Sequence, residues 1–138
     1  MNPYLKTYKE NSILTAPPEQ ILLMLYDGAI SFVNQAKVHM QNKNIEQTNF
    51  CIIKAERIVT EFMNTLNFDV GGDLAKNLYS LYNYLYNRLI EANIKKNPEM
   101  LDEVLGHLQE LRTTWDEAIK LNNKQLNEEN KLVGKFLA

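Results

Sequence analysis

The sequence predicts an all-α protein, an antiparallel up-down four-helix bundle, and three observations support this prediction. First, the 138 residues include only 5 Gly and 4 Pro, which is few for a chain with many turns. Second, short breaker motifs leave four stretches, each roughly 30 to 37 Å long as a helix. Third, apolar residues in every stretch recur at alternating steps of three and four, the pattern of a helix with one buried face. Short connections between helices of matched length favour antiparallel neighbours.

The breaker motifs set the expected boundaries of these helices. They are Ala16-Pro17-Pro18, Asn42-Lys43-Asn44, Asp69-Val70-Gly71-Gly72, Asn97-Pro98 and Asn122-Asn123. Gly71-Gly72 can adopt positive φ values, and Asn97-Pro98 combines a helix N-cap with a proline at the first helical position. We therefore expect helices over residues 18–41, 44–68, 72–95 and 98–121.

Each expected helix has one apolar seam that should form the core. The seam residues are Leu22, Leu25, Ala29, Phe32, Ala36 and Met40 in the first, Ile45, Thr48, Ile52, Ala55, Val59, Phe62 and Leu66 in the second, Leu74, Leu78, Leu81, Leu85, Leu89 and Ala92 in the third, and Leu101, Val104, Leu108, Leu111, Trp115 and Ala118 in the fourth.

The whole chain, residues 1–138, is expected to form one domain. Residues 1–15 are predicted to be an N-terminal cap segment and residues 16–121 the bundle. For residues 122–138 two alternatives stay open, a loose C-terminal tail and a short fifth helix. No signal peptide and no apolar run of membrane-spanning length is recognisable, so a cytoplasmic location is expected.

Composition argues against several functional classes. With 15 Lys+Arg against 17 Asp+Glu, the chain lacks the basic excess of a dedicated nucleic-acid binder. A single cysteine, Cys51, excludes an internal disulfide and any multi-cysteine zinc site. No membrane insertion is expected either, because the longest apolar run is only Ile21 to Tyr26.

The two histidines, His39 and His107, do not support metal or phosphate chemistry. A di-iron bundle needs Glu-x-x-His motifs, but the residues three positions earlier are Ala36 and Val104. Phosphotransfer bundles resemble one another in a His followed by Lys and Gly at +3 and +4, and neither histidine has this pattern. We therefore expect that the protein is not an enzyme and has no catalytic residue, metal or cofactor. A phosphotransfer bundle is retained only as a less favoured alternative.

Apolar side chains outside the seams indicate a binding surface. Tyr79, Tyr82 and Tyr86 form one stripe on the third helix, although such rings can also flank a core with their hydroxyls in water. Excess apolar surface on several helices is typical of a groove for an amphipathic helix. The candidate groove residues are Ile53, Met63, Tyr79, Tyr82, Tyr86, Leu105 and Ile119. Periodicity alone would indicate a non-catalytic adaptor for some amphipathic helix.

Several motifs, in order along the chain, are similar to those of one family. The segments are Met24–Ile30 (MLYDGAI), Lys54–Val59 (KAERIV), Leu66–Leu78 (LNFDVGGDLAKNL), Leu81–Leu85 (LYNYL), Leu89–Asn93 (LIEAN), Leu111-Arg112 and Trp115–Ala118 (WDEA). Together they resemble the FliS family of flagellar secretion (flagellin export) chaperones, over residues 8 to about 119.

The resemblance implies a function that needs no catalytic group. Members of the family bind the disordered C-terminal region of flagellin in the cytoplasm, prevent premature polymerisation and deliver it to the flagellar type III export gate. The segment containing Tyr8 and Ile13 resembles the family's N-terminal segment, which covers part of the flagellin-binding surface and is linked to docking at the export gate. The implied partners are the flagellin C-terminal segment and a component of the export gate, with other flagellar regulators left open. The tail after Lys120 is longer and more apolar than in many members, so it is either weakly docked or a groove occupant that cargo displaces.

Overall fold

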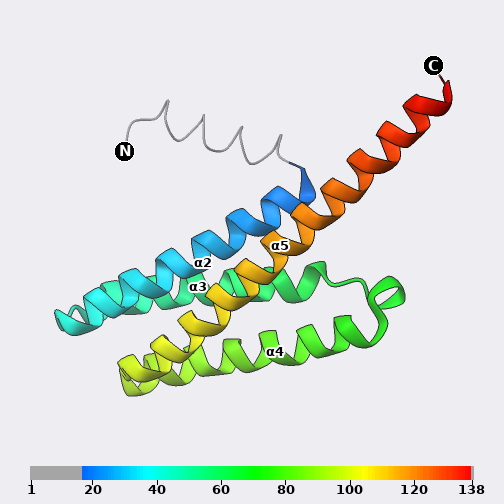
Figure 1. The fold of residues 1–138 in the computed structure, drawn as a ribbon. Helices are drawn as coiled ribbons and strands as arrows, with labels where there is room; N and C mark the ends of the chain where they lie inside the picture. The colour runs from blue at the N-terminus through cyan, green and yellow to red at the C-terminus, as the bar shows by residue number, and fades with distance from the viewer. Residues whose placement is uncertain (1–16, 138) are drawn as a thin grey trace. The chain divides into compact units, whose positions relative to one another are not determined.

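The computed structural model describes residues 17–137, with side chains up to residue 131. It contains four helices, α2 (Pro18–Gln41), α3 (Ile45–Thr65), α4 (Phe68–Lys95) and α5 (Pro98–Leu137), as Figure 1 shows. The described residues include no strand, which confirms the predicted all-α class. They divide into two compact units, residues 25–110 (unit 2) and the described parts of residues 1–24 and 111–138 (unit 1). That the whole chain forms one domain stays a prediction.

Asparagine begins three of the four helices by the same chemistry. The side chain of Asn44 accepts a hydrogen bond from the backbone N–H of Gln47 at 3.2 Å. Asn67 accepts from the next turn in the same way, and Asn97 Oδ1 accepts from the backbone N–H of Glu99 at 2.9 Å. These contacts satisfy backbone donors that have no partner inside the helix, so the predicted cap at Asn97 is confirmed.

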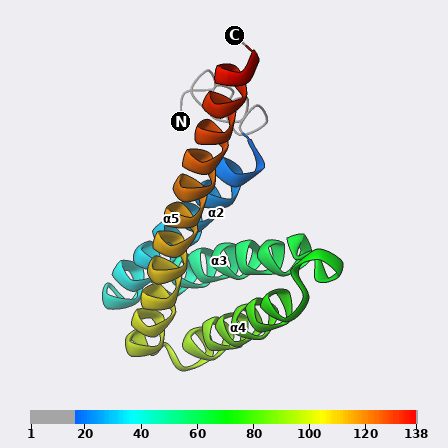
Figure 2. The same ribbon diagram turned by 45° about the vertical axis from the view of Figure 1, so that its right-hand side comes forward.

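α4 contains a break at Gly72. This residue has φ 51° and ψ −126°, values outside the helical region, whereas the residues on either side are helical. A short turn over residues 68–71 therefore precedes the longer helix, and Figure 2 shows it at the start of α4, where the chain arrives from α3. Only glycine adopts a conformation of this kind without strain, so the predicted break is confirmed at Gly72. The predicted end of the second helix at residue 68 is wrong, because α3 ends at Thr65 and α4 begins at Phe68.

The predicted break at Asn122-Asn123 is wrong. α5 runs without interruption from Pro98 to Leu137, so residues 122–137 extend the fourth helix instead of forming a separate one. Asparagine costs well under about 1 kcal/mol in a helix relative to alanine. The Leu, Lys and Gln residues around Asn122 are good helix formers, and they offset this small cost.

Contacts within unit 2 define the order and direction of its helices. Lys37 near the end of α2 forms an ion pair with Asp102 near the start of α5. Arg88 of α4 pairs with Glu103 of α5 at 2.8 Å, so α5 has α2 and α4 as neighbours. The Lys96 ammonium, just beyond α4, donates to Asn49 near the start of α3 at 2.5 Å. Each pair joins helices of opposite direction, which confirms the antiparallel up-down arrangement.

All four helices contribute to the core of unit 2. Its buried residues are Tyr26, Ala29, Val33 and Ala36 of α2, Thr48, Cys51, Ile52, Ala55, Val59 and Phe62 of α3, Ala75, Tyr82, Leu85, Leu89 and Ala92 of α4, and Leu101, Val104 and Leu108 of α5. Burying a Leu, Val or Phe side chain contributes about 1.5–3 kcal/mol. This shared core is therefore the main source of the stability of unit 2.

Some predicted seam positions differ from the observed core. In α2, Ala29 and Ala36 are buried as predicted, whereas the other buried residues are Leu23, Tyr26 and Val33. Leu22, Leu25 and Phe32, which were predicted in their place, are only half-buried. The predicted core residues Ile45, Leu74 and Ala118 are exposed. Ile45 and Leu74 lie near the ends of α3 and α4, where fewer neighbouring turns are available to cover a side chain.

Candidate partner-binding surface

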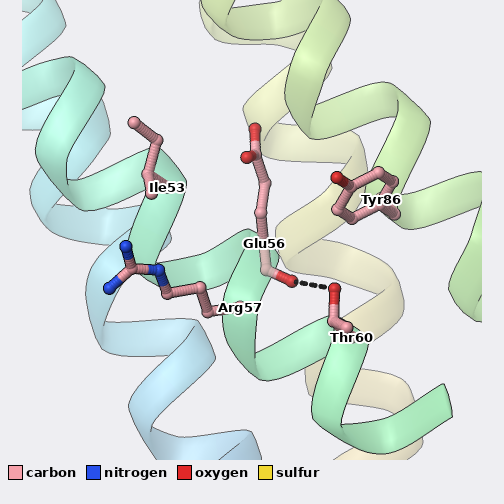
Figure 3. A pocket seen from close by; sticks show the side chains of 5 residues that line it. All are labelled: Ile53, Glu56, Arg57, Thr60 and Tyr86. Atoms are coloured by element: carbon pink, nitrogen blue, oxygen red, sulfur yellow. Dashed lines mark hydrogen bonds between the residues drawn. The ribbon is translucent and has the colours of Figure 1, made fainter. Parts of the chain in front are cut away.

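A shallow depression of about 310 Å³ lies between α3 and α4. Ile53, Glu56, Arg57 and Thr60 of α3 line one side and Tyr86 of α4 the other, as Figure 3 shows. Ile53 is 42% exposed, and the Tyr86 ring is half-buried. The structure thus brings together two of the residues that were predicted to bind a partner.

Two more predicted residues extend the same surface. Met63 follows Glu56 and Thr60 at positions i+7 and i+3, and Tyr79 precedes Tyr86 by seven residues, so each lies on the same face of its helix. Both residues belong to the same end of the antiparallel pair, where the rings of Phe62 and Tyr82 are 5.3 Å apart. We call this surface the α3–α4 face, and it comprises Ile53, Glu56, Thr60, Met63, Tyr79 and Tyr86.

The carboxylate of Glu56 has an unusual environment within this face. Burial raises the pKa of Glu56 above its ordinary value, because desolvation disfavours the charged form. The carboxylate has no hydrogen-bond or ion-pair partner among the described residues. Figure 3 shows it extending alongside Tyr86, whereas the guanidinium of Arg57 points in another direction. The hydroxyl of Thr60 donates a hydrogen bond to the backbone oxygen of Glu56 at 3.0 Å and therefore does not pair with the Glu56 carboxylate.

One predicted groove residue belongs to the core. Tyr82 is only 2% exposed, and its hydroxyl forms a hydrogen bond with the hydroxyl of Tyr26 at 2.6 Å. The placement of Tyr82 in an open groove is therefore wrong for this structure. A tyrosine can be buried when its hydroxyl finds a partner, and this partner is distant in the sequence.

The remaining predicted residues do not belong to the α3–α4 face. Leu105 is half-buried and lies one turn after Asp102, which pairs with Lys37 of α2. It therefore lies on the side of α5 that is turned towards α2. Ile119 is half-buried within unit 1. Tyr8 and Ile13 lie outside the described residues.

Exposed apolar side chains also gather at the Gly72 break, and the sequence analysis missed most of them. Val70 is 85% exposed and Leu74 62% exposed. The exposed ring of Phe68 packs edge-on against Tyr79 at a centroid distance of 5.9 Å. The signal was present in the sequence, because apolar residues beside a glycine break have few neighbouring turns to cover them. Leu74 was instead assigned to the core seam.

A polar network on the opposite side of α4 was also missed. Tyr84 Oη donates to Glu103 Oε1 at 2.5 Å, and Arg88 Nε donates to Glu103 Oε2 at 2.8 Å. The hydrogen bond from Tyr84, followed by that from Arg88, lowers the pKa of Glu103. The ring of His107 lies edge-on to Tyr84 at 6.2 Å. The carboxylate of Glu103 on α5 is therefore paired with Tyr84 and Arg88 of α4, and the network joins the two helices.

Neither a metal centre nor a membrane span is found in the described part of the chain. Residues 17–137 contain no group of three or more His, Cys, Asp or Glu side chains that could hold a metal ion. Among the helices of this same range, none is both long enough and apolar enough to cross a membrane.

The fold and this surface define a helical-bundle protein with exposed apolar side chains on two neighbouring helices. The sequence model of the family described as "Flagellar protein FliS" matches residues 1–122. The chain therefore belongs to the FliS family, which confirms the resemblance found in its motifs. Residues 123–138 lie beyond the matched range.

Individual relatives agree with this assignment. The chain is 38% identical over 123 residues to the flagellar secretion chaperone FliS of Bacillus subtilis (strain 168), covering 89% of this chain and 90% of that protein. It is 35% identical over 117 residues to the protein of the same name from Vibrio cholerae serotype O1, covering 85% and 86%. A crystal structure of a bacterial flagellar chaperone is similar with a TM-score of 0.71 at 20% identity, covering 86% of this chain and 98% of that one. At this identity the structural likeness shows the fold alone.

Proposed function

We propose that this chain is a cytoplasmic export chaperone for flagellin. It binds the disordered C-terminal region of flagellin, prevents premature polymerisation and delivers its cargo to the flagellar type III export gate. Membership of the FliS family is the observation that carries the proposal. The names of the Bacillus and Vibrio relatives, both flagellar secretion chaperones, support it.

The α3–α4 face supports this function physically. Ile53 and Tyr79 are exposed there, and Tyr86 and Met63 are half-buried. An amphipathic helix that covers this surface removes apolar area from water at about 25 cal/mol per Å². A disordered segment must also be ordered when it binds, which reduces the net affinity. Such a protein acts through affinity alone and requires no catalytic group.

Two further parts of the proposal concern partners and regulation. A component of the export gate is a second partner, and other flagellar regulators are left open. The N-terminal segment that contains Tyr8 and Ile13 acts as a movable cover of the cargo surface and takes part in docking at the gate. Deleting residues 1–15 and measuring cargo affinity tests the cover, because removal of a competing segment raises the affinity for cargo.

A second candidate is an adaptor for an amphipathic helix from a protein other than flagellin. The same exposed side chains on α3 and α4 would serve it. Phosphotransfer is not proposed, since His39 and His107 are both half-buried and lack the sequence context of such modules. Binding to flagellin separates the first candidate from the second.

The test is a calorimetric titration with the C-terminal segment of flagellin from the same organism, followed in parallel by circular dichroism. We expect saturable one-to-one binding, a negative heat-capacity change and a gain of helix, the signature of coupled folding and binding. Ile53→Asp should weaken binding at least tenfold, because it places a charge in the apolar contact. Val38→Asp, at an exposed apolar position of α2, is the matched control. Absence of binding to the wild-type chain would overturn the proposal.

A further inference from the structure

Glu56 differs from the other acidic side chains described on α3. It is half-buried, whereas Glu46 and Glu61 are exposed. Its carboxylate lines the depression together with Ile53 and Tyr86, and the described residues offer it no cationic partner. The depression therefore combines apolar surface from Ile53 and Tyr86 with the polar groups of Glu56, Arg57 and Thr60, and the carboxylate of Glu56 is left to be solvated by water.

A partner that fills this depression removes that water. An apolar side chain alone would leave the carboxylate desolvated and unpaired, which is strongly unfavourable. A lysine or arginine beside the apolar side chain supplies a charge-assisted hydrogen bond in place of the lost water. Arg57 does not supply it, because its side chain points elsewhere (Figure 3) and adjacent helical residues do not face each other.

We propose that Glu56 determines partner specificity by pairing with a lysine or arginine of the bound segment, while Ile53 and Tyr86 hold an apolar side chain one helical turn away. The inference rests on the proposed function and names the chemistry of the cargo at this point. The occupant is thus an amphipathic helix with a basic residue three or four positions from an apolar anchor, since this spacing places both on one face.

The raised pKa of Glu56 supports this geometry. Burial alone accounts for the shift, and no neighbouring charge counters it. Tyr86, from α4, and Arg57, from α3, are the other titratable or charged groups that line the depression. A cation beside this carboxylate would therefore supply an interaction that the described residues do not provide.

The experiment compares wild type, Glu56→Gln, Glu56→Lys and Glu61→Gln in titrations with the C-terminal segment of flagellin from the same organism. Glu56→Gln keeps the size of the side chain and removes its charge, and Glu61→Gln is the matched control at an exposed position of the same helix. We expect Glu56→Gln to weaken binding about tenfold and Glu56→Lys about a hundredfold, as for other close charge pairs at interfaces. Glu61→Gln should bind like wild type. Thermal melts of each variant verify that the fold is retained.

A second arm identifies the basic partner residue. Each Lys and Arg of the flagellin segment is changed to Gln and titrated against wild type and Glu56→Gln. At one position, the change to Gln should weaken binding of the flagellin segment to wild type but have little effect on its binding to Glu56→Gln. This is the result expected for two directly coupled residues in a double-mutant cycle. Unchanged or tighter binding by Glu56→Gln, or no coupled position, would overturn this inference and leave the proposed function intact. If the wild-type chain fails to bind, the proposed function and the inference resting on it both fall.

Discussion

The phenolic oxygens of Tyr26 and Tyr82 are 2.6 Å apart in the core of unit 2 and share one hydrogen bond. These residues are separated by 56 positions in the chain and belong to α2 and α4. Between them lies Phe62 of α3, stacked on Tyr26 at 4.3 Å and tilted against Tyr82 at 5.3 Å. Three helices are therefore joined by one aromatic cluster with a polar pair at its edge.

This pair gives a prediction about stability. Tyr26→Phe or Tyr82→Phe removes one hydroxyl and should lower the free energy of unfolding by about 1 kcal/mol, because the remaining hydroxyl loses a buried partner. Tyr82→Ala also leaves a cavity and should cost about 3–5 kcal/mol. Urea unfolding followed by circular dichroism measures both effects. The double mutant Tyr26→Phe/Tyr82→Phe should cost less than the sum of the single changes, and simple additivity would contradict a direct hydrogen bond.

The glycines of the chain provide a second prediction with an internal control. Gly72→Ala should destabilise the protein by about 1–3 kcal/mol, since alanine is strained at φ 51°. A Cβ at this position meets no atom within 4 Å, so the cost is conformational and not steric. Gly106→Ala has equally open space but lies inside α5, and it should stabilise by about 0.5–1 kcal/mol. Denaturant midpoints that move in the same direction for both variants would contradict this assignment of backbone conformations.

Much of the fold follows from local sequence patterns. The helix starts at Asn44 and Asn97 depend on capping, and the break at Gly72 inside α4 depends on positive φ; these are properties of a few neighbouring residues. The seam of α3 was also largely predictable, because Thr48, Ile52, Ala55, Val59 and Phe62 are buried as the helical period indicated, although Ile45 at the start of the helix is exposed. α2 was harder, since its apolar run from Ile21 to Tyr26 satisfies two helical phases, and only packing against other helices selects between them.

The candidate site was less predictable for the same reason. Ile53 and Tyr86 could be selected from helical phase, but whether a tyrosine is core or surface depends on a distant partner. Tyr82 can lie in the core because its hydroxyl forms a hydrogen bond with the hydroxyl of Tyr26, which belongs to another helix. Glu56 was not recognised as special, because its isolation depends on what α4 places opposite it. Pairings between helices are set by tertiary structure and leave no periodic signal in the sequence.

The network around Glu103 predicts a dependence of stability on pH. Hydrogen bonds from Tyr84 and then Arg88 lower the pKa of Glu103 in the folded state, relative to about 4.3 for an unperturbed glutamate. Its stabilising contribution is thus complete above that ordinary value and is lost as the pH falls through the lowered pKa. Wild type should exceed Glu103→Gln by at most about 1 kcal/mol at neutral pH, because these groups lie near the surface.

The measurement is the urea midpoint of both proteins from pH 7 down to pH 3. The difference in midpoint between the two proteins should shrink towards zero at the acid end. Lys95 also lowers the pKa of Glu91, but the effect of Glu91 on stability cancels in this difference because both proteins retain it. Glu110→Gln, at an exposed position of α5, should follow wild type throughout. A difference that stays constant with pH would show that the charge of Glu103 is not the source of its effect.

The helical extension beyond Asn122 can be removed to distinguish the two hypotheses for the C-terminal tail. Every side chain from Leu121 to Lys131 is exposed, and the family match ends at residue 122. A chain truncated after Asn122 should therefore unfold within about 0.5 kcal/mol of wild type, as expected for changes at exposed positions, while losing helical signal in circular dichroism. It should bind the flagellin segment with unchanged affinity, because the exposed side chains of residues 123–131 do not occupy a groove. A rise in affinity on truncation would instead support a tail that occupies the groove and is displaced by cargo, and a Leu126→Gln variant of the full chain would then reproduce part of that rise.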